Sequence, residues 1–65
     1  MQLFTVQGMT CGHCVRAVTQ AIRQEDPAAD VQIELSSQEV KVQSVLSAEH
    51  IIRLIAEEGY QAQSV

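Results

Sequence analysis

The stretch VQIELSSQEVKV, residues 31–42, decides the fold of this chain of 65 residues. Apolar and polar side chains alternate from Val31 to Leu35 and again from Val40 to Val42. This two-residue period is typical of strands that bury one face. The polar segment 36–38 predicts a turn between them, so the two strands should pair as an antiparallel hairpin.

A helix is predicted on each side of this hairpin. On the N-terminal side, apolar residues at positions 15, 18, 21 and 22 follow helical spacing from His13, and the helix should end near residue 24 or 25, before Pro27. On the C-terminal side, Ser47 is a good N-cap and isoleucines at positions 51, 52 and 55 form an apolar face. Gly59 fits the left-handed position that ends a helix.

Two outer strands complete the pattern. Alternation predicts a first strand over residues 2–7 and a short last strand containing residues 60, 62 and 64. The resulting order, β-α-β-β-α-β, is that of the α+β ferredoxin-like fold. We therefore expect a single domain over residues 1–65, with a four-stranded antiparallel sheet, two helices on one face and the other face open to water.

This topology predicts which loops lie near one another. The loop after the first strand, the turn at residues 36–38 and the junction at residues 59–60 should share one end of the sheet. His50 and the loop at residues 25–30 should lie at the other end, about 20 Å away across strands of this length. Residues of the second group should therefore not reach those of the first.

The composition argues against several classes of function. Eight acidic residues against four Lys and Arg give a net charge of −4, which disfavours nucleic acid and anionic membranes as partners. No apolar run is long enough to span a bilayer, and residues 1–7 lack the basic start and apolar core of a signal peptide. We expect a cytoplasmic protein without membrane insertion, in which two cysteines indicate metal or redox chemistry rather than a disulfide.

The segment GMTCGHC, residues 8–14, carries the one evident chemical signal. Cys14 should open the first helix, where free backbone N–H groups and the helix dipole stabilise a thiolate. Thiolates are soft ligands that suit Cu(I), zinc or iron–sulfur clusters. The spacing of Cys11 and Cys14 lets both sulfurs converge on one ion, and two sulfurs on an exposed loop suit Cu(I) and its transfer to another thiolate.

The other metals fit less well. Structural zinc requires four ligands, and the chain holds two cysteines and two histidines, but His50 is predicted at the far end of the sheet. A cluster requires about four cysteines. We expect the ring of His13 to point to solvent, with an added ligand in a metal-bridged dimer as the alternative. Met9 is interpreted as a core residue rather than a thioether ligand.

In its motif and element order the chain resembles bacterial copper chaperones of the heavy-metal-associated domain family. The resemblance covers essentially the whole chain, from GMTCGHC after the first strand to the Glu58-Gly59-Tyr60 junction. It implies a Cu(I) carrier, not an enzyme, with Cys11 and Cys14 as ligands. It also implies that Met9 supports the loop and that Tyr60 lies near the sulfurs. Thr10 before Cys11 favours copper over zinc or cadmium. The acidic, proline-containing segment 25–30 departs from the family pattern, away from the site.

The resemblance also implies partners and leaves alternatives. The expected partners are the metal-binding domains of a copper-exporting P-type ATPase or a copper-responsive regulator, and a copper-bridged homodimer is a further expectation. The start at Met1 and the absence of a flanking linker favour a free-standing protein over a domain excised from a copper-transporting ATPase. A dithiol oxidoreductase and a simple metal buffer are the remaining alternatives.

Overall fold

The computed structural model describes residues 2–9 and 12–65, and it has the predicted β-α-β-β-α-β order. Met1, Thr10 and Cys11 lie outside the described residues. The elements are β1 (Gln2–Gln7), α1 (Gly12–Glu25), β2 (Asp30–Glu34), β3 (Glu39–Gln43), α2 (Ala48–Glu57) and β4 (Gln61–Ser64).

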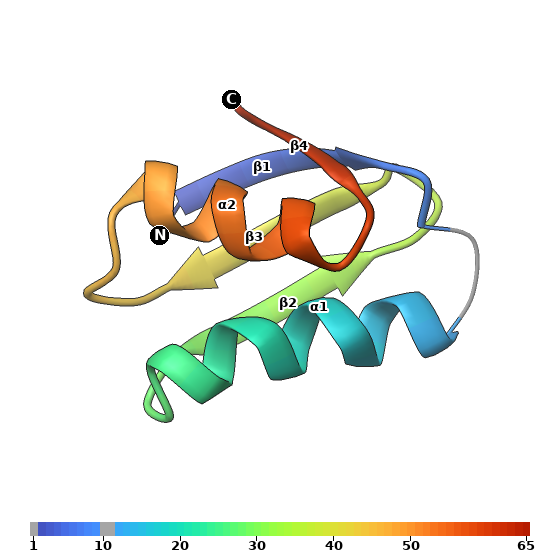
Figure 1. Cartoon of the computed structure of the whole chain (residues 1–65). Helices are drawn as coiled ribbons and strands as arrows, with labels where there is room; N and C mark the ends of the chain where they lie inside the picture. The colour runs from blue at the N-terminus through green and yellow to red at the C-terminus, as the bar shows by residue number, and fades with distance from the viewer. Residues whose placement is uncertain (1, 10–11) are drawn as a thin grey trace.

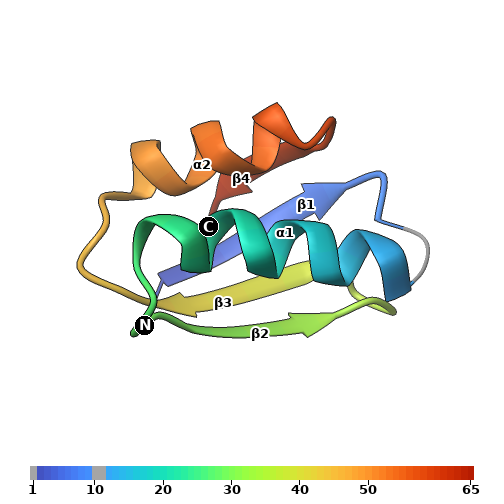
Figure 2. The same ribbon diagram turned by 60° about the horizontal axis from the view of Figure 1, so that its bottom comes forward.

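The four strands form one antiparallel sheet in the order β2-β3-β1-β4. Both helices lie on the same side of this sheet (Figures 1 and 2). Figure 2 also shows that the end of β1, the β2–β3 turn and the α2–β4 turn gather at one end, while the α1–β2 and β3–α2 loops lie at the other. The predicted ferredoxin-like fold and its division into two ends are confirmed.

The core lies between the sheet and the two helices. It is built by alternate residues of the strands and one face of each helix, because these are the positions that point between the two layers. The buried apolar residues are Phe4, Val6, Met9, Cys14, Val18, Ile22, Ala29, Val40, Val42, Ile51 and Ile55. In the described part of the chain no helix has the length and apolar character needed to cross a bilayer.

The ends of α2 follow the predicted capping chemistry. The Ser47 hydroxyl accepts a hydrogen bond of 3.1 Å from the backbone N–H of His50, which satisfies one of the N–H groups left open at a helix start. Gly59 has φ of +96° and directly follows the C-cap, and its N–H donates to the carbonyl of Ala56 at 2.9 Å. These contacts fix where the chain turns into β4.

Two strand boundaries and one core position differ from the prediction. Leu35 belongs to the turn rather than to β2, and 37% of its surface is exposed. Tyr60 precedes β4 rather than starting it. On α1 the buried row runs through Cys14, Val18 and Ile22 at four-residue spacing, so Cys14 takes the core position that the apolar pattern assigned to Val15. A cysteine packs as a small apolar residue, which periodicity arguments based on valine overlook.

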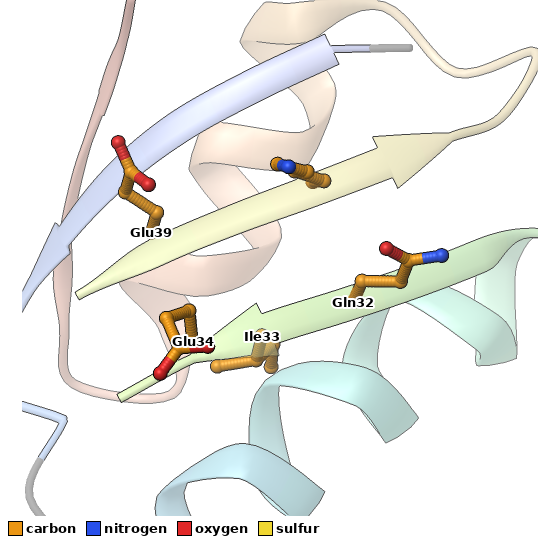
Figure 3. A pocket seen from close by; sticks show the side chains of 5 residues that line it. Gln32, Ile33, Glu34 and Glu39 are labelled. Atoms are coloured by element: carbon orange, nitrogen blue, oxygen red, sulfur yellow. The ribbon is translucent and has the colours of Figure 1, made fainter. Parts of the chain in front are cut away.

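The uncovered face of the sheet is polar. Gln32 lies opposite Lys41 and Glu34 opposite Glu39 in the β2–β3 ladder, and these four residues with Ile33 line a shallow pocket on β2 and β3 (Figure 3). The carboxylates of Glu34 and Glu39 each accept a hydrogen bond from a turn serine. This face is therefore solvated, as the alternating pattern predicts.

The end opposite the cysteine motif is held by side chains of the two connecting loops. The carboxylate of Asp26, after α1, accepts hydrogen bonds from the Ser44 hydroxyl at 2.6 Å and from the N–H groups of Ala28 and Val45. These bonds, the Ser44 contact first, lower the pKa of Asp26 below its ordinary value of 3.8. His50 Nε2 lies 3.2 Å from the Glu25 carboxylate, which places His50 at the predicted end.

Candidate metal centre

The cysteine motif occupies the connection between β1 and α1. Residues 8 and 9 continue the chain from β1, and α1 begins at Gly12. Cys11, the first predicted ligand, and Thr10, the residue taken to favour copper, lie outside the described residues. The described flanks of the motif are Gly8 and Met9 on the N-terminal side and Cys14 on the C-terminal side, and the neighbouring turns surround them.

Cys14, the second predicted ligand, is the third residue of α1 and lies in its first turn. Its N-terminal position gives the sulfur the helix dipole and nearby backbone N–H groups. Only 8% of the residue is exposed, and it belongs to the core cluster. The sequence predicted two sulfurs on an exposed loop, and for Cys14 this expectation is wrong, because the turn of α1 directs residue 14 toward the sheet.

Met9 packs into the core, as predicted, and is 1% exposed. A long, unbranched side chain can fill an irregular gap beneath a loop. Burial at this position anchors the chain two residues before Cys11, and it removes the thioether from the surface. Met9 therefore supports the motif from inside the molecule.

Tyr60 lies against the start of the same loop. A Cβ atom placed on Gly8 would be 3.3 Å from Cδ1 of the Tyr60 ring, and Gly8 has φ of +98°. A side chain at position 8 would therefore meet both the ring and an unfavourable backbone conformation. The predicted proximity of residue 60 to the cysteine motif is thus explained by a close approach between the ring and the Gly8 backbone.

Gln38 is a neighbour of the motif that sequence reasoning did not single out. Its side-chain Nε2 donates a hydrogen bond of 3.2 Å to the backbone carbonyl of Met9, across 29 residues of sequence. The topology predicted that the turn at 36–38 lies at this end, but a glutamine in a polar turn carries no signal of such a contact. Its left-handed φ of +56° is a structural feature that composition does not reveal.

The histidines do not join a four-ligand zinc site in the described part of the chain. His13 is exposed on the first turn of α1, in agreement with the prediction, and His50 is paired with Glu25 at the far end. Among residues 2–9 and 12–65, no group of three or more His, Cys, Asp or Glu side chains is arranged to hold a metal ion.

Comparison with known proteins gives a consistent picture. The model of the heavy-metal-associated domain family matches residues 3–61. The copper chaperone CopZ of Enterococcus hirae is 31% identical over 98% of this chain and 97% of its own length. The structure of the copper chaperone Atx1 from Synechocystis superposes with a TM-score of 0.91 and 36% identity, covering 94% of this chain and 97% of that one.

A larger protein also contains a matching region. The copper-exporting P-type ATPase of Vibrio cholerae is 33% identical over 94% of this chain, which spans only 6% of the ATPase. The same module thus occurs in relatives of very different length.

Proposed function

This chain belongs to the heavy-metal-associated domain family, and from that premise we propose that it is a copper chaperone that binds one Cu(I) ion through Cys11 and Cys14. The observation that carries the proposal is the place of the cysteine motif. It stands where β1 passes into α1, with Cys14 in the first turn of the helix and Met9 buried below. The similarity to CopZ and Atx1, both copper chaperones, supports the same reading.

The chemistry of the ligands favours a soft monovalent ion. Two thiolates satisfy Cu(I), which accepts low coordination, whereas structural zinc requires four ligands. A thiolate at the 8%-exposed position of Cys14 carries charge into a nearly dry environment, which is unfavourable unless a cation compensates it. Bound Cu(I) would supply that compensation, and the helix dipole of α1 would add to it.

Delivery follows from the same arrangement. We propose that a thiolate of a partner attacks the bound ion and that Cys14, which is buried, releases it last. The partners we propose are the metal-binding domains of a copper-exporting P-type ATPase, with a copper-responsive regulator and a copper-bridged second copy as further recipients. The chain would act as a carrier without turnover, in the reducing cytoplasm where thiolates persist.

The match to the Vibrio cholerae ATPase favours a second candidate, namely that the chain acts as a metal-binding domain of such a transporter. We prefer the free-standing carrier, a single domain over residues 1–65, because CopZ and Atx1 are matched over nearly their whole length. Partner transfer separates the two: a carrier passes copper to the isolated metal-binding domain of an ATPase, whereas a domain of the transporter receives it from a chaperone.

The proposal is tested by an anaerobic Cu(I) titration of the reduced protein against a competing chelator, with Zn(II) run in parallel. We expect one tightly bound Cu(I) and weak zinc binding. Cys11→Ser and Cys14→Ser should each lose tight binding, whereas His50→Ala, at the far end of the sheet, should bind as the wild type does. Tight zinc with weak copper, or normal copper binding in both cysteine variants, would overturn the proposal.

A further inference from the structure

We propose that Gln38 is a positioning residue for the metal-binding loop, an inference that rests on the function proposed above. The amide of its side chain donates a hydrogen bond to the carbonyl of Met9, the residue that precedes Thr10 and Cys11 in the motif. This carbonyl belongs to the peptide bond that leads into Thr10. A hydrogen bond at that point restricts the rotation of the peptide plane from which the loop departs.

The backbone of Gln38 is fixed independently of its side chain. Its carbonyl accepts a 2.8 Å hydrogen bond from the N–H of Val6 in β1, and its N–H donates to the carbonyl of Leu35 at 3.2 Å, closing the turn. Gln38 therefore extends the contact between β1 and the β2–β3 hairpin beyond the ladder. The side chain of Gln38 therefore extends toward Met9 from a backbone that cannot shift without breaking these two hydrogen bonds.

Met9 is held from two sides as a result. Its side chain is 1% exposed and anchored in the core, and its carbonyl is held by Gln38 from the neighbouring turn. One contact fixes the residue's depth and the other fixes the orientation of its peptide. A loop that starts from a fixed peptide plane loses less freedom when its thiolates close on an ion, so binding is tighter.

The conformation of Gln38 argues that its side chain has a role beyond the turn. At φ of +56° glycine or asparagine is favoured, since other side chains adopt the left-handed region unwillingly. If position 38 had only to shape the turn, glycine or asparagine would adopt this φ at a lower cost in free energy. Neither can make the bond to Met9: glycine lacks an amide side chain, and that of asparagine is one methylene shorter.

This contrast provides the experiment. We expect Gln38→Gly and Gln38→Asn to leave the thermal midpoint of the metal-free protein unchanged or raised, because the strained turn is relieved. Both should weaken Cu(I) binding in the chelator competition by up to about fivefold, the free energy of one typical hydrogen bond being the upper limit of what pre-organising the loop can contribute. Ser37→Ala is the matched control, because the Ser37 hydroxyl contacts Glu39 in the same turn. It should retain wild-type affinity.

A readout without metal tests the contact itself. In the NMR spectrum of the metal-free protein, one side-chain amide proton of Gln38 should exchange with solvent several-fold more slowly than those of the exposed Gln32. Wild-type Cu(I) affinity in both Gln38 variants, or equally fast exchange at the two glutamines, would overturn the positioning role. Failure of the wild type itself to bind Cu(I) would instead overturn the proposed function.

Discussion

At the candidate site, Gly8 is the residue that both its backbone conformation and its packing restrict to glycine. Its φ of +98° lies in the region that residues with a Cβ rarely adopt, and the Tyr60 ring occupies the space that a Cβ would need. The close approach ties the α2–β4 junction to the loop that precedes the cysteines. Substitution at this position therefore probes how tightly that end of the molecule is assembled.

Gly8→Ala should destabilise the protein by roughly 1–2 kcal/mol, the range associated with forcing a side chain into a left-handed conformation. The matched variant is Gly12→Ala, because Gly12 lies in α1 and an added Cβ would meet no described atom within 4 Å outside its chain neighbours and its own helix backbone. It should be neutral or slightly stabilising, since alanine favours a helix. Urea unfolding of the two variants measures the difference, and equal midpoints would contradict the account of Gly8.

At the scale of single residues, the sequence indicates candidate ligands, whose role stays a prediction, but not the contacts around them. Cys11 and Cys14 stand out because thiols at this spacing suit one ion, and Met9 was correctly assigned to the core. The burial of Cys14 was not foreseen, because periodicity pointed to its neighbour Val15. The contact of Gln38 with Met9 could not be predicted, since it depends on the mutual placement of two loops and on a φ that no residue preference suggests.

At the scale of elements, the residues that cap helices were the reliable signal. Ser47 and Gly59 mark the two ends of α2 because their roles are local, namely an accepting hydroxyl and a left-handed backbone. The end of β2 was less predictable. Leu35 continues the apolar alternation, yet it enters the turn that Gln38 closes. Alternation therefore overestimates a strand wherever an apolar residue is recruited into the adjoining turn.

The hydrogen bonds of Asp26, which join the α1–β2 loop to the β3–α2 loop, predict that the stability of the protein depends on pH. Because the folded-state pKa of Asp26 is lowered, its contribution to stability is present above its ordinary value of 3.8 and is lost as the pH falls through the folded value. As the pH falls from about 5 to below 3.8, the wild type should therefore lose stability more steeply than Asp26→Asn. Urea unfolding at a series of pH values measures this slope.

Ser44→Ala tests the cause of that dependence. The hydroxyl of Ser44 is the main group that lowers the pKa of Asp26, at an oxygen–oxygen distance of 2.6 Å. Removing this hydroxyl should therefore make the loss of stability with falling pH nearly as shallow as the loss expected for Asp26→Asn. An unchanged slope in both variants would mean that other groups govern acid unfolding.

At the scale of the whole molecule, the core is one thin layer. A chain of 65 residues is expected to have roughly 3–10 kcal/mol of stability at about 0.05–0.15 kcal/mol per residue. A single large core side chain, whose loss costs about 2–5 kcal/mol, therefore accounts for a large share of that stability. The two helices and the sheet must therefore fold together, with no part retaining a core of its own.

Ile55→Ala should destabilise the protein by about 2–5 kcal/mol, because it removes a fully buried side chain of α2 and leaves a cavity. Val45→Ser, at a position that is 92% exposed in the β3–α2 loop, should remain within about 0.5 kcal/mol of the wild type. Chemical denaturation followed by circular dichroism compares the pair. A loss below about 1 kcal/mol for Ile55→Ala would show that the core collapses around the gap.

The position of Cys14 within the core has a consequence for how damage to this protein would be recognised. Oxidation of its thiol to a sulfinic or sulfonic acid would place charged oxygens among packed apolar side chains. The modified chain would then spend more time unfolded and would become a substrate for proteases. A molecule that can no longer hold its cargo would thus be removed by the cell's ordinary quality control, without a dedicated sensor for the lesion.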